Sequence, residues 1–284
     1  MLKSLCVKTN NNKAINYLLE KFNTVNLNSL YISTAKFKLY NNFIIHYSGK
    51  DLDLFYYTFS DIISSLIIDL YEERILKRII SSNYFYFTNA EQKKILDICK
   101  DYLYNEGLDE AIIRTDSIKL SCIEYFVNNK SAVLDGFINF RIKDYIKIID
   151  YVVDLAVNKF VIDKEYNEFV ELLKCYINSK DCNASLVHLI YQNGETILLD
   201  EFKNIITVDD TALNSKYLSD ISFSSNDYAL NTLLTLLPEK IYIHVIDNTQ
   251  DEFINTIKLI FDDKVYICND CNLCKLYRLK KIHK

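Results

Sequence analysis

Glycine and proline are scarce in this sequence, which has 4 Gly and 1 Pro among 284 residues. Both lie well below their usual shares of about 7% and 5%. The glycines stand apart at positions 49, 107, 136 and 194, so the chain has no Gly-rich phosphate-binding loop. The metalloprotease pattern H-E-x-x-H and the hydrolase pattern G-x-S-x-G are also missing. The absence of a catalytic constellation favours a non-enzymatic protein.

A surplus of basic residues is missing as well. The chain has 33 Lys and Arg against 38 Asp and Glu, a net charge of −5, with both signs mixed along its length. The densest basic stretch is the short C-terminal tail with Lys275, Arg278, Lys280, Lys281 and Lys284. Phosphate neutralisation supplies most of the affinity for nucleic acid. Nucleic acid is therefore disfavoured as the main partner, and we expect a protein partner.

Long apolar runs are also absent. The most apolar segment, residues 53–69, is interrupted by Asp61 and is shorter than the ~18 to 20 residues that span a bilayer. Residues 1–7 lack the long apolar stretch of a signal peptide. We therefore predict a cytoplasmic protein without a transmembrane segment. Cytoplasmic thiols stay reduced, so the eight cysteines are expected to be free, metal-bound or catalytic.

Half of the residues are hydrophobic, enough for a sizeable core. The periodicity of these residues changes twice along the chain and predicts an α+β fold in three parts. These are a small N-terminal α/β unit (1–50), a central helical bundle (51–181), and a C-terminal α/β domain (182–284) with a hairpin, a βαβ unit and a cysteine-rich tail. In the first part, a strand at 2–7 precedes a helix and a hairpin that turns at Asn41 and Asn42.

The middle part has the period of helices. Apolar residues recur at steps of three and four between Phe55 and Leu70. Thr88 and Glu91 form the pattern of a capping box, which predicts the start of another helix. Glu72 and Glu73 are interpreted as ordinary solvated positions. Further helices are predicted at 118–127, 132–161 and 165–177.

The last part begins with a predicted hairpin. Its two apolar strands, 186–191 and 196–199, flank Asn193 and Gly194, the pair that favours a tight turn. A helix at 224–237 is ended by Pro238. A strand, a helix capped by residues 249–252, and a second strand then predict a parallel βαβ unit. The two strands of that unit are expected at 241–246 and 264–267.

Three segments of the middle part carry a resemblance to a known family. They are Gly-Phe-Ile-Asn-Phe-Arg-Ile-Lys-Asp-Tyr at 136–145, Val-Val-Asp-Leu-Ala-Val at 152–157 and Lys-Glu-Tyr-Asn-Glu-Phe at 164–169. In these segments the chain resembles the YtxC family of sporulation proteins. The resemblance implies a role in endospore formation in a Gram-positive bacterium. It implies no reaction, ligand or catalytic residue.

Arg141 lies in an apolar seam of the predicted helix 132–161. An unpaired buried charge is costly, so the guanidinium must pair or reach water. Its candidate partners are Asp144 on the next turn and Glu165 or Glu168 on the following helix. One interpretation is a structural ion pair. The other is that Arg141 and Tyr145 bind an anionic ligand or a partner's carboxylate. A small-molecule enzyme with its site near Arg141 is a further alternative.

Cys268, Cys271 and Cys274 form C-x-x-C-x-x-C directly after the last predicted strand. Gaps of two residues let thiolates converge on one metal, so zinc or an Fe–S cluster is a possible cofactor. A structural zinc needs four ligands, and the ferredoxin pattern lacks its fourth cysteine here. Asp270, His283 or a cysteine from another copy could complete the site. Redox catalysis and reduced bystander thiols are the alternatives.

The remaining cysteines and histidines are given simpler interpretations. Apolar helical patterns contain three cysteines, which predicts small core residues: Cys99, Cys122 and Cys175. His188 and His244 lie in strand patterns and are interpreted as core imidazoles. The leading hypothesis is a sporulation-associated interaction or scaffold protein. A metal-binding or Fe–S protein and a small-molecule enzyme are the two alternatives.

Overall fold

The computed structural model describes residues 2–105, 109–206, 224–247, 252–268 and 270–280. The chain forms two compact units, unit 1 (residues 1–163) and unit 2 (residues 164–284), which are considered separately. Both contain helices and strands, which confirms the α+β fold. No described helix combines the length and the apolar character needed to cross a bilayer. The predicted division at residues 50 and 181 stays a prediction.

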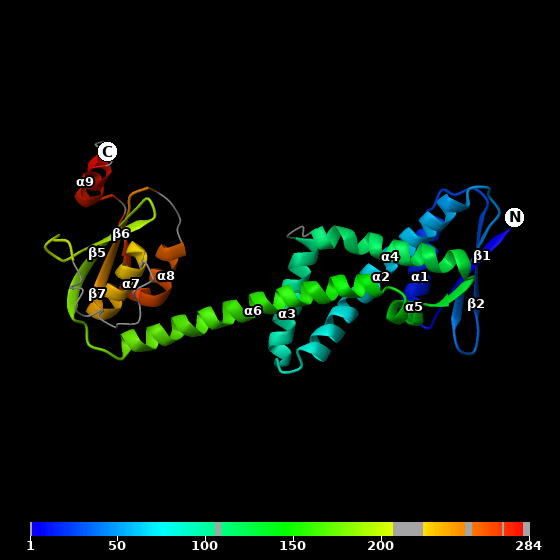
Figure 1. Cartoon of the computed structure of the whole chain (residues 1–284), viewed down its shortest axis with the longest axis horizontal. Helices are drawn as coiled ribbons and strands as arrows, with labels where there is room; N and C mark the ends of the chain where they lie inside the picture. Colours follow the sequence, from blue (N-terminus) through cyan, green and yellow to red (C-terminus); the bar gives the residue numbers. More distant parts are fainter. Residues whose placement is uncertain (1, 106–108, 207–223, 248–251, 269, 281–284) are drawn as a thin grey trace. The chain divides into compact units, whose positions relative to one another are not determined.

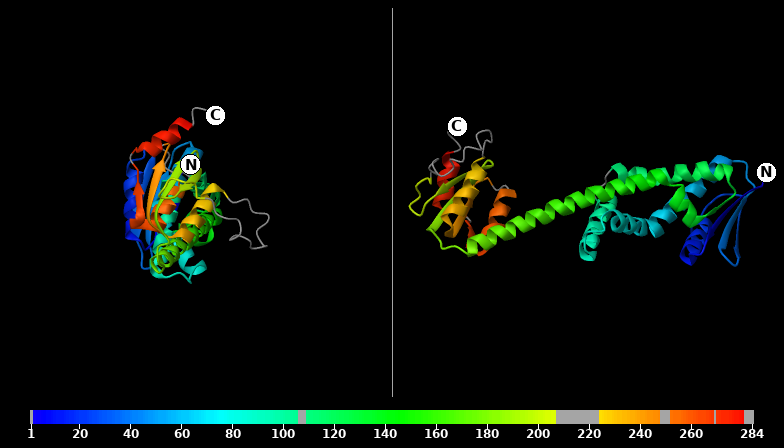
Figure 2. Two further views of the ribbon diagram at one scale, coloured as in Figure 1. Left: turned by 90° about the vertical axis from the view of Figure 1, so that its left-hand side faces the viewer. Right: turned by 60° about the horizontal axis from the view of Figure 1, so that its bottom comes forward.

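Unit 1 contains a four-stranded sheet with the order β2-β3-β1-β4. The predicted antiparallel hairpin is formed by β2 (Leu30–Lys36) and β3 (Asn41–Tyr47), and β3 also pairs with β1 (Lys3–Thr9). Its turn at Asn41 and Asn42 was wrong, because these two residues already pair with β2 and the connection is made by residues 37–40. The helix α1 (Asn12–Asn23) lies beside these strands (Figure 2). It buries Ala14, Leu18 and Phe22. The short strand β4 (Ser131–Val133) pairs in parallel with β1 and was not predicted. The N-terminal strands therefore share a sheet with the helical middle.

The helices of unit 1 bury one continuous hydrophobic core. The longest of its early helices, α2 (Leu52–Asn83), buries the apolar stripe that the sequence predicts. The capping box at the start of α3 (Asn89–Tyr104) is present: the Thr88 hydroxyl accepts from the Glu91 N–H, and the Glu91 carboxylate accepts from the Thr88 N–H. The remaining helices are α4 (Asp109–Asn128), α5 (Leu134–Phe140) and the first part of α6 (Lys143–Asn178).

The prediction of one helix at 132–161 was wrong. This segment contains β4, α5 and the beginning of α6, with a break at Arg141 and Ile142. A separate helix at 165–177 was also wrong, because α6 continues without interruption to Asn178. The apolar period continues through Arg141, but α5 ends there, and residues 131–133 pair with β1 as a strand instead of joining a helix.

Unit 2 contains a second four-stranded sheet with the order β6-β5-β7-β8 (Figure 1). The hairpin of β5 (Ala184–Gln192) and β6 (Glu195–Leu199) is confirmed, and its turn has φ of 54° at Asn193 and 81° at Gly194. The helix α7 (Ser225–Leu236) leads to β7 (Pro238–Val245). The helix α8 (Glu252–Phe261) then leads to β8 (Val265–Ile267), which is parallel to β7 as predicted. Three of the four residues of the predicted α8 cap, 249–251, lie outside the described residues.

The sheet of unit 2 is covered on both faces. One face packs against α7, α8 and the end of α6 through Val187, Leu189 and Ile243. The other face packs against α9 (Asn272–Lys280), a short helix that was not predicted. Figure 1 shows α7 and α8 on one side of the strands and α9 apart from them. The run of three cysteines connects β8 to α9 and so lies on this second face.

Candidate metal centre

Four potential metal ligands converge where α9 meets the sheet. Three are the predicted Cys268, Cys271 and Cys274, and the fourth is His244 of β7. Side chains alternate along a strand, so His244 faces away from the core that contains Ile243 and toward α9. Cys268 directly follows β8, where its N–H donates to the Ile243 carbonyl at 2.9 Å. The edge of the sheet and the start of α9 together place the four groups.

The ligand atoms of this cluster all lie within 4.8 Å of one another. The Cys274 sulfur is 3.7 Å from that of Cys268 and 3.9 Å from that of Cys271. His244 Nδ1 lies 3.3 Å from the Cys274 sulfur and 3.5 Å from the Cys271 sulfur. One tetrahedral zinc ion, with bonds of about 2.3 Å to sulfur and about 2.0 Å to nitrogen, separates its ligands by about 3.8 Å (S–S) and about 3.5 Å (S–N). The observed separations match those values.

The environment keeps the imidazole of His244 neutral. His244 is only 2% exposed. Burial, and after it the neighbouring His188, lower its pKa to about 4. A metal binds the unprotonated nitrogen of a histidine. His244 is therefore in the protonation state that a ligand needs.

The sulfurs of Cys271 and Cys274 have different environments. Burial is the largest influence on the Cys271 thiol and raises its pKa, but N–H groups of Cys274 and Leu273 and the Cys268 thiol donate to this sulfur, and the net pKa is lowered. The two N–H donors belong to the first turn of α9, a position that stabilises a thiolate. Cys274 is 1% exposed. Burial first, and then the neighbouring thiols, raise its pKa to about 11.

A second histidine supports the first. His188 of β5 places its Nδ1 3.0 Å from Nε2 of His244. A metal bound at His244 Nδ1 would leave the Nε2–H to donate to His188. Metal-binding histidines are commonly oriented by a hydrogen bond of this kind to the other ring nitrogen. Burial, followed by nearby Lys203, lowers the pKa of His188, which keeps this acceptor neutral.

The fourth potential ligand, His244, differs from those that the sequence offered. Asp270 instead pairs with Arg278 at 3.0 Å, and His283 lies outside the described residues. The interpretation of His244 as a core imidazole overlooked its position near the carboxyl end of a parallel strand, where ligands gather. That position, next to the sheet edge where the cysteines begin, was the signal in the sequence that could have identified His244 as a potential ligand.

The other cysteines are distributed over both units. Cys99 and Cys122 are buried as predicted, but Cys175 is exposed, so its interpretation as a core residue was wrong. It lies on α6 between Lys174 and Tyr176, on the side of the helix that the core does not cover. Cys182 is exposed as well, and Cys6 is partly buried on β1. All eight cysteines are free thiols.

Arg141 does not occupy a packed seam. It is the C-cap of α5, its side chain is exposed, and its guanidinium lies 5.4 Å from the centre of the Tyr125 ring. Asp144 pairs with Lys147 at 2.8 Å instead. Glu165 and Glu168 are exposed on α6 in unit 2, where Glu168 pairs with Lys164 at 4.0 Å. Arg141 thus contacts the Tyr125 ring, and Asp144 has a different partner, because the helix ends where the sequence predicted its middle. Pairing of Arg141 with Glu165 or Glu168 stays a prediction.

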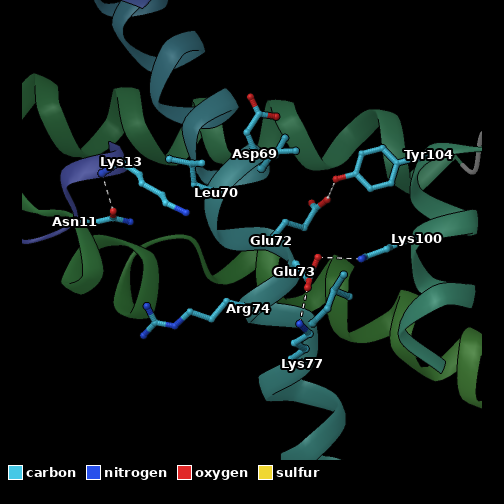
Figure 3. Close-up of a pocket in the computed structure, with 12 residues that line it drawn as sticks. Asn11, Lys13, Asp69, Leu70, Glu72, Glu73, Arg74, Lys77, Lys100 and Tyr104 are labelled. Atoms are coloured by element: carbon cyan, nitrogen blue, oxygen red, sulfur yellow. Dashed lines mark hydrogen bonds and ion pairs between the residues drawn. The ribbon is translucent and has the colours of Figure 1, made fainter. Parts of the chain in front are cut away.

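Tyr145 instead belongs to a buried polar network around Glu72. The Tyr145 hydroxyl donates to one Glu72 oxygen at 3.0 Å, and Arg114 Nε donates to the same oxygen at 3.0 Å. The Tyr104 hydroxyl donates to the other oxygen at 2.6 Å (Figure 3). Glu72 is 2% exposed and Arg114 6% exposed, so the interpretation of Glu72 as solvated was wrong. The network joins four helices, α2, α3, α4 and α6.

Glu72 and Tyr104 also line a pocket of about 740 Å³ in unit 1 (Figure 3). Glu73 beside it is exposed, as expected, and pairs with Lys77 at 2.5 Å and with Lys100 at 2.9 Å. These two ammonium groups lower the pKa of Glu73 to about 2. One carboxylate therefore serves two lysines, and Lys13 and Arg74 also line the pocket.

Comparisons with known proteins identify the family. Residues 57–266 match the model of the YtxC-like family. A curated relative, "Uncharacterized protein YtxC" of Bacillus subtilis (strain 168), is 18% identical over 216 residues, which cover 72% of this chain and 74% of that protein. No solved structure matches. The matched range includes His188 and His244 and ends before Cys268. The chain belongs to the YtxC-like family.

Proposed function

We propose that unit 2 is a zinc-binding module whose ion is held by His244, Cys268, Cys271 and Cys274. The observation that carries this proposal is the convergence of three sulfurs and one unprotonated imidazole nitrogen at the separations of a tetrahedral site. The residue types support it too, because Cys₃His is a common ligand set for structural zinc. The neighbouring His188 supplies the orienting hydrogen bond that such sites contain.

Zinc fits this cluster better than an Fe–S cluster. In a [4Fe–4S] cluster each cysteine binds a different iron, so the ligand sulfurs surround a body several atoms across. Here the sulfurs of Cys268 and Cys271 both lie within 3.9 Å of the Cys274 sulfur. A single ion fills that space. Soft thiolates with one imidazole favour zinc among the divalent ions that prefer tetrahedral geometry.

The proposed role of the ion is structural. Four protein ligands leave no open position for substrate or water, which is the mark of a structural zinc site. The ion would connect β7, the end of β8 and the first turn of α9. Apart from that, a small cluster holds α9 on the sheet: Ile190, Leu199, Ile246, Leu273, Cys274 and Tyr277. Zinc binding would therefore supply much of the free energy that keeps α9 in place.

Metal analysis tests this proposal directly. The full chain, purified without a histidine tag and under anaerobic conditions, is expected to contain one zinc per molecule. Replacement with Co²⁺ should give the absorption of a tetrahedral thiolate complex. A double variant, Cys175→Ser with Cys182→Ser, removes the two exposed thiols and should leave both results unchanged. A metal content near zero, with no Co²⁺ complex, would contradict a zinc site.

A second proposal concerns unit 1 and follows the leading hypothesis from the sequence. We propose that this cytoplasmic chain acts in a spore-forming cell by binding a protein partner rather than by catalysis. The specific support is the loop between α2 and α3, where Phe85 is 76% exposed and Tyr86 is 64% exposed. Exposed aromatic side chains that lie together are typical of partner-binding sites. Their rings are in edge contact, with centroids 5.9 Å apart.

This second proposal is tested by affinity capture from sporulating cells. The wild-type chain is compared with a double variant, Phe85→Ser with Tyr86→Ser, and with Phe202→Ser. Phe202 lies in unit 2 and is also 76% exposed, so it controls for the loss of an exposed ring. We expect the wild-type chain and Phe202→Ser to capture the same protein in an amount proportional to the chain used as bait. The double variant should fail to capture it. Equal capture by all three chains would contradict a partner site at this loop.

A further inference from the structure

Two ligands of the metal centre form the pattern C-x-x-C at the beginning of a helix. Cys271 immediately precedes α9, and Cys274 lies in its first turn. The Lys275 N–H donates to the Cys271 carbonyl at 3.1 Å, which is the backbone bond of a helix N-cap. In disulfide oxidoreductases, this placement stabilises the first sulfur as a thiolate and keeps the second ready to form a disulfide. The two sulfurs are 3.9 Å apart here.

We propose that Cys271 and Cys274 are a reversible redox pair, that a peroxide oxidises them to a disulfide, and that this oxidation releases the bound ion. The inference rests on the proposed zinc site and adds its regulation. The two sulfurs differ in access: Cys271 is partly exposed, whereas Cys274 is 1% exposed. An incoming oxidant therefore reaches Cys271 first, and Cys274 is shielded from direct attack.

The reaction has two steps. The Cys271 thiolate attacks one oxygen of hydrogen peroxide, an S–O bond forms and the O–O bond breaks. The departing hydroxide takes a proton and leaves as water, which gives a sulfenic acid at Cys271. The Cys274 thiolate then attacks this sulfur, an S–S bond forms, and the S–O bond breaks to release a second water after protonation. In sum, two thiolates, one peroxide and two protons give one disulfide and two waters.

Oxidation removes two of the four ligands. Cys268 and His244 remain, and two ligands hold zinc far more weakly than four. The disulfide also changes the first turn of α9, which includes the buried Leu273 and Cys274. Because α9 covers the sheet through a small apolar cluster, the loss of the ion is expected to loosen α9. A thiol reductant together with zinc reverses both changes.

The test uses the full zinc-loaded chain and hydrogen peroxide. Zinc release is followed with a chromogenic chelator, and the disulfide is located by mass spectrometry of peptides. We expect one zinc released for each Cys271–Cys274 disulfide, with both reversed by dithiothreitol and added zinc. The control is the double variant Cys175→Ser with Cys182→Ser. It lacks the exposed thiols outside the site and is expected to release zinc at the wild-type rate.

A second measurement does not depend on zinc content. The variants Cys268→Ser and Cys271→Ser are each treated with peroxide in the presence of a chelator. Cys268→Ser keeps the redox pair and should form the Cys271–Cys274 disulfide. Cys271→Ser lacks the sulfur that reacts first. The remaining thiols of its site should be oxidised at least about tenfold more slowly than those of Cys268→Ser, because reactivity follows thiolate character and access.

The outcomes separate this inference from the zinc proposal. Zinc that stays bound while its thiols resist peroxide would overturn the redox pair and leave the zinc site standing. A disulfide that joins Cys268 to Cys274 instead would also overturn the assignment of Cys271. A chain that never binds zinc would overturn the zinc proposal and, with it, the release of an ion on oxidation.

Discussion

The two units of this chain handle buried polar groups in opposite ways. Unit 1 buries a full charge, and its own residues satisfy it: Glu72 accepts from Arg114, Tyr104 and Tyr145. Unit 2 brings three thiols and an uncharged imidazole together within 4.8 Å. Among the described residues, those four groups have mainly one another as partners. A buried carboxylate paired with an arginine needs no further partner, whereas the four groups of unit 2 need an ion if the proposed zinc site is to be complete.

This difference leads to different expectations for stability. The network of unit 1 is embedded in one large core shared by sheet and helices. In unit 2, the second face of the sheet has only a small cluster to hold α9. The stability of unit 1 should therefore depend on single side chains, and that of α9 on the ion. Each prediction below tests one side of this comparison.

The largest expected effect is the removal of zinc from unit 2. Structural zinc sites contribute about 10–16 kcal/mol of apparent binding free energy. Chelation, or the variant Cys274→Ser, should therefore remove hydrogen-exchange protection from α9 and from the adjoining end of β7. Protection of α2 and α3 in unit 1 should stay the same. The control is Cys182→Ser, an exposed thiol of the same unit. Unchanged exchange in α9 after complete chelation would contradict the structural role of the ion.

The next effect concerns the buried charge of unit 1. In the variant Glu72→Ala, Arg114 loses its carboxylate while 6% exposed. Breaking a buried pair in this way costs about 3–5 kcal/mol. The neighbouring Glu73→Ala is the matched control, because an exposed ion pair contributes about 0–1 kcal/mol. Hydrogen exchange in the helices of unit 1, measured against denaturant, gives both values. Equal effects of the two variants would show that the Glu72 network does not stabilise unit 1.

A smaller effect is expected at the histidine that orients His244. The variant His188→Ala removes the acceptor at 3.0 Å from His244 Nε2. The loss of such a partner typically lowers metal affinity by about 10–100-fold. His188→Asn keeps an acceptor oxygen and should recover part of the affinity. His46→Ala, in unit 1, is the control. Competition with a chelator of known affinity measures all three, and an unchanged affinity in His188→Ala would exclude an orienting role.

Local signals in the sequence predicted most of the secondary structure. The Asn193-Gly194 turn, the capping box at Thr88 and Glu91, and the stop at Pro238 each depend on neighbouring residues, and the structure contains all three. The beginning of the predicted helix 132–161 was wrong because residues 131–133 pair as β4 with β1, which lies more than a hundred residues earlier. Periodicity alone contains no information about that pairing.

The candidate site was predicted in the same partial way. The spacing of Cys268, Cys271 and Cys274 is local and pointed to a metal, although not to its fourth ligand. His244 comes from a strand that precedes the cysteines by an entire helix, so only the parallel pairing of β7 and β8 brings it near. The Glu72 network requires four helices to meet, and a pair of adjacent glutamates gives no sign of which one is buried.

The smallest expected effect separates two arginines of unit 1 that both lie over a tyrosine ring. Arg141 is 5.4 Å from the Tyr125 ring and is exposed, whereas Arg114 is 5.0 Å from the Tyr104 ring and pairs with buried Glu72. Arg141→Ala should cost about 0.5–1 kcal/mol, the value of an exposed cation–π contact. Arg114→Ala should cost about 3–5 kcal/mol, because Glu72 stays buried without its partner. Denaturant unfolding monitored in unit 1 compares them. A loss at Arg141 as large as that at Arg114 would mean that its guanidinium is held by more than one exposed ring.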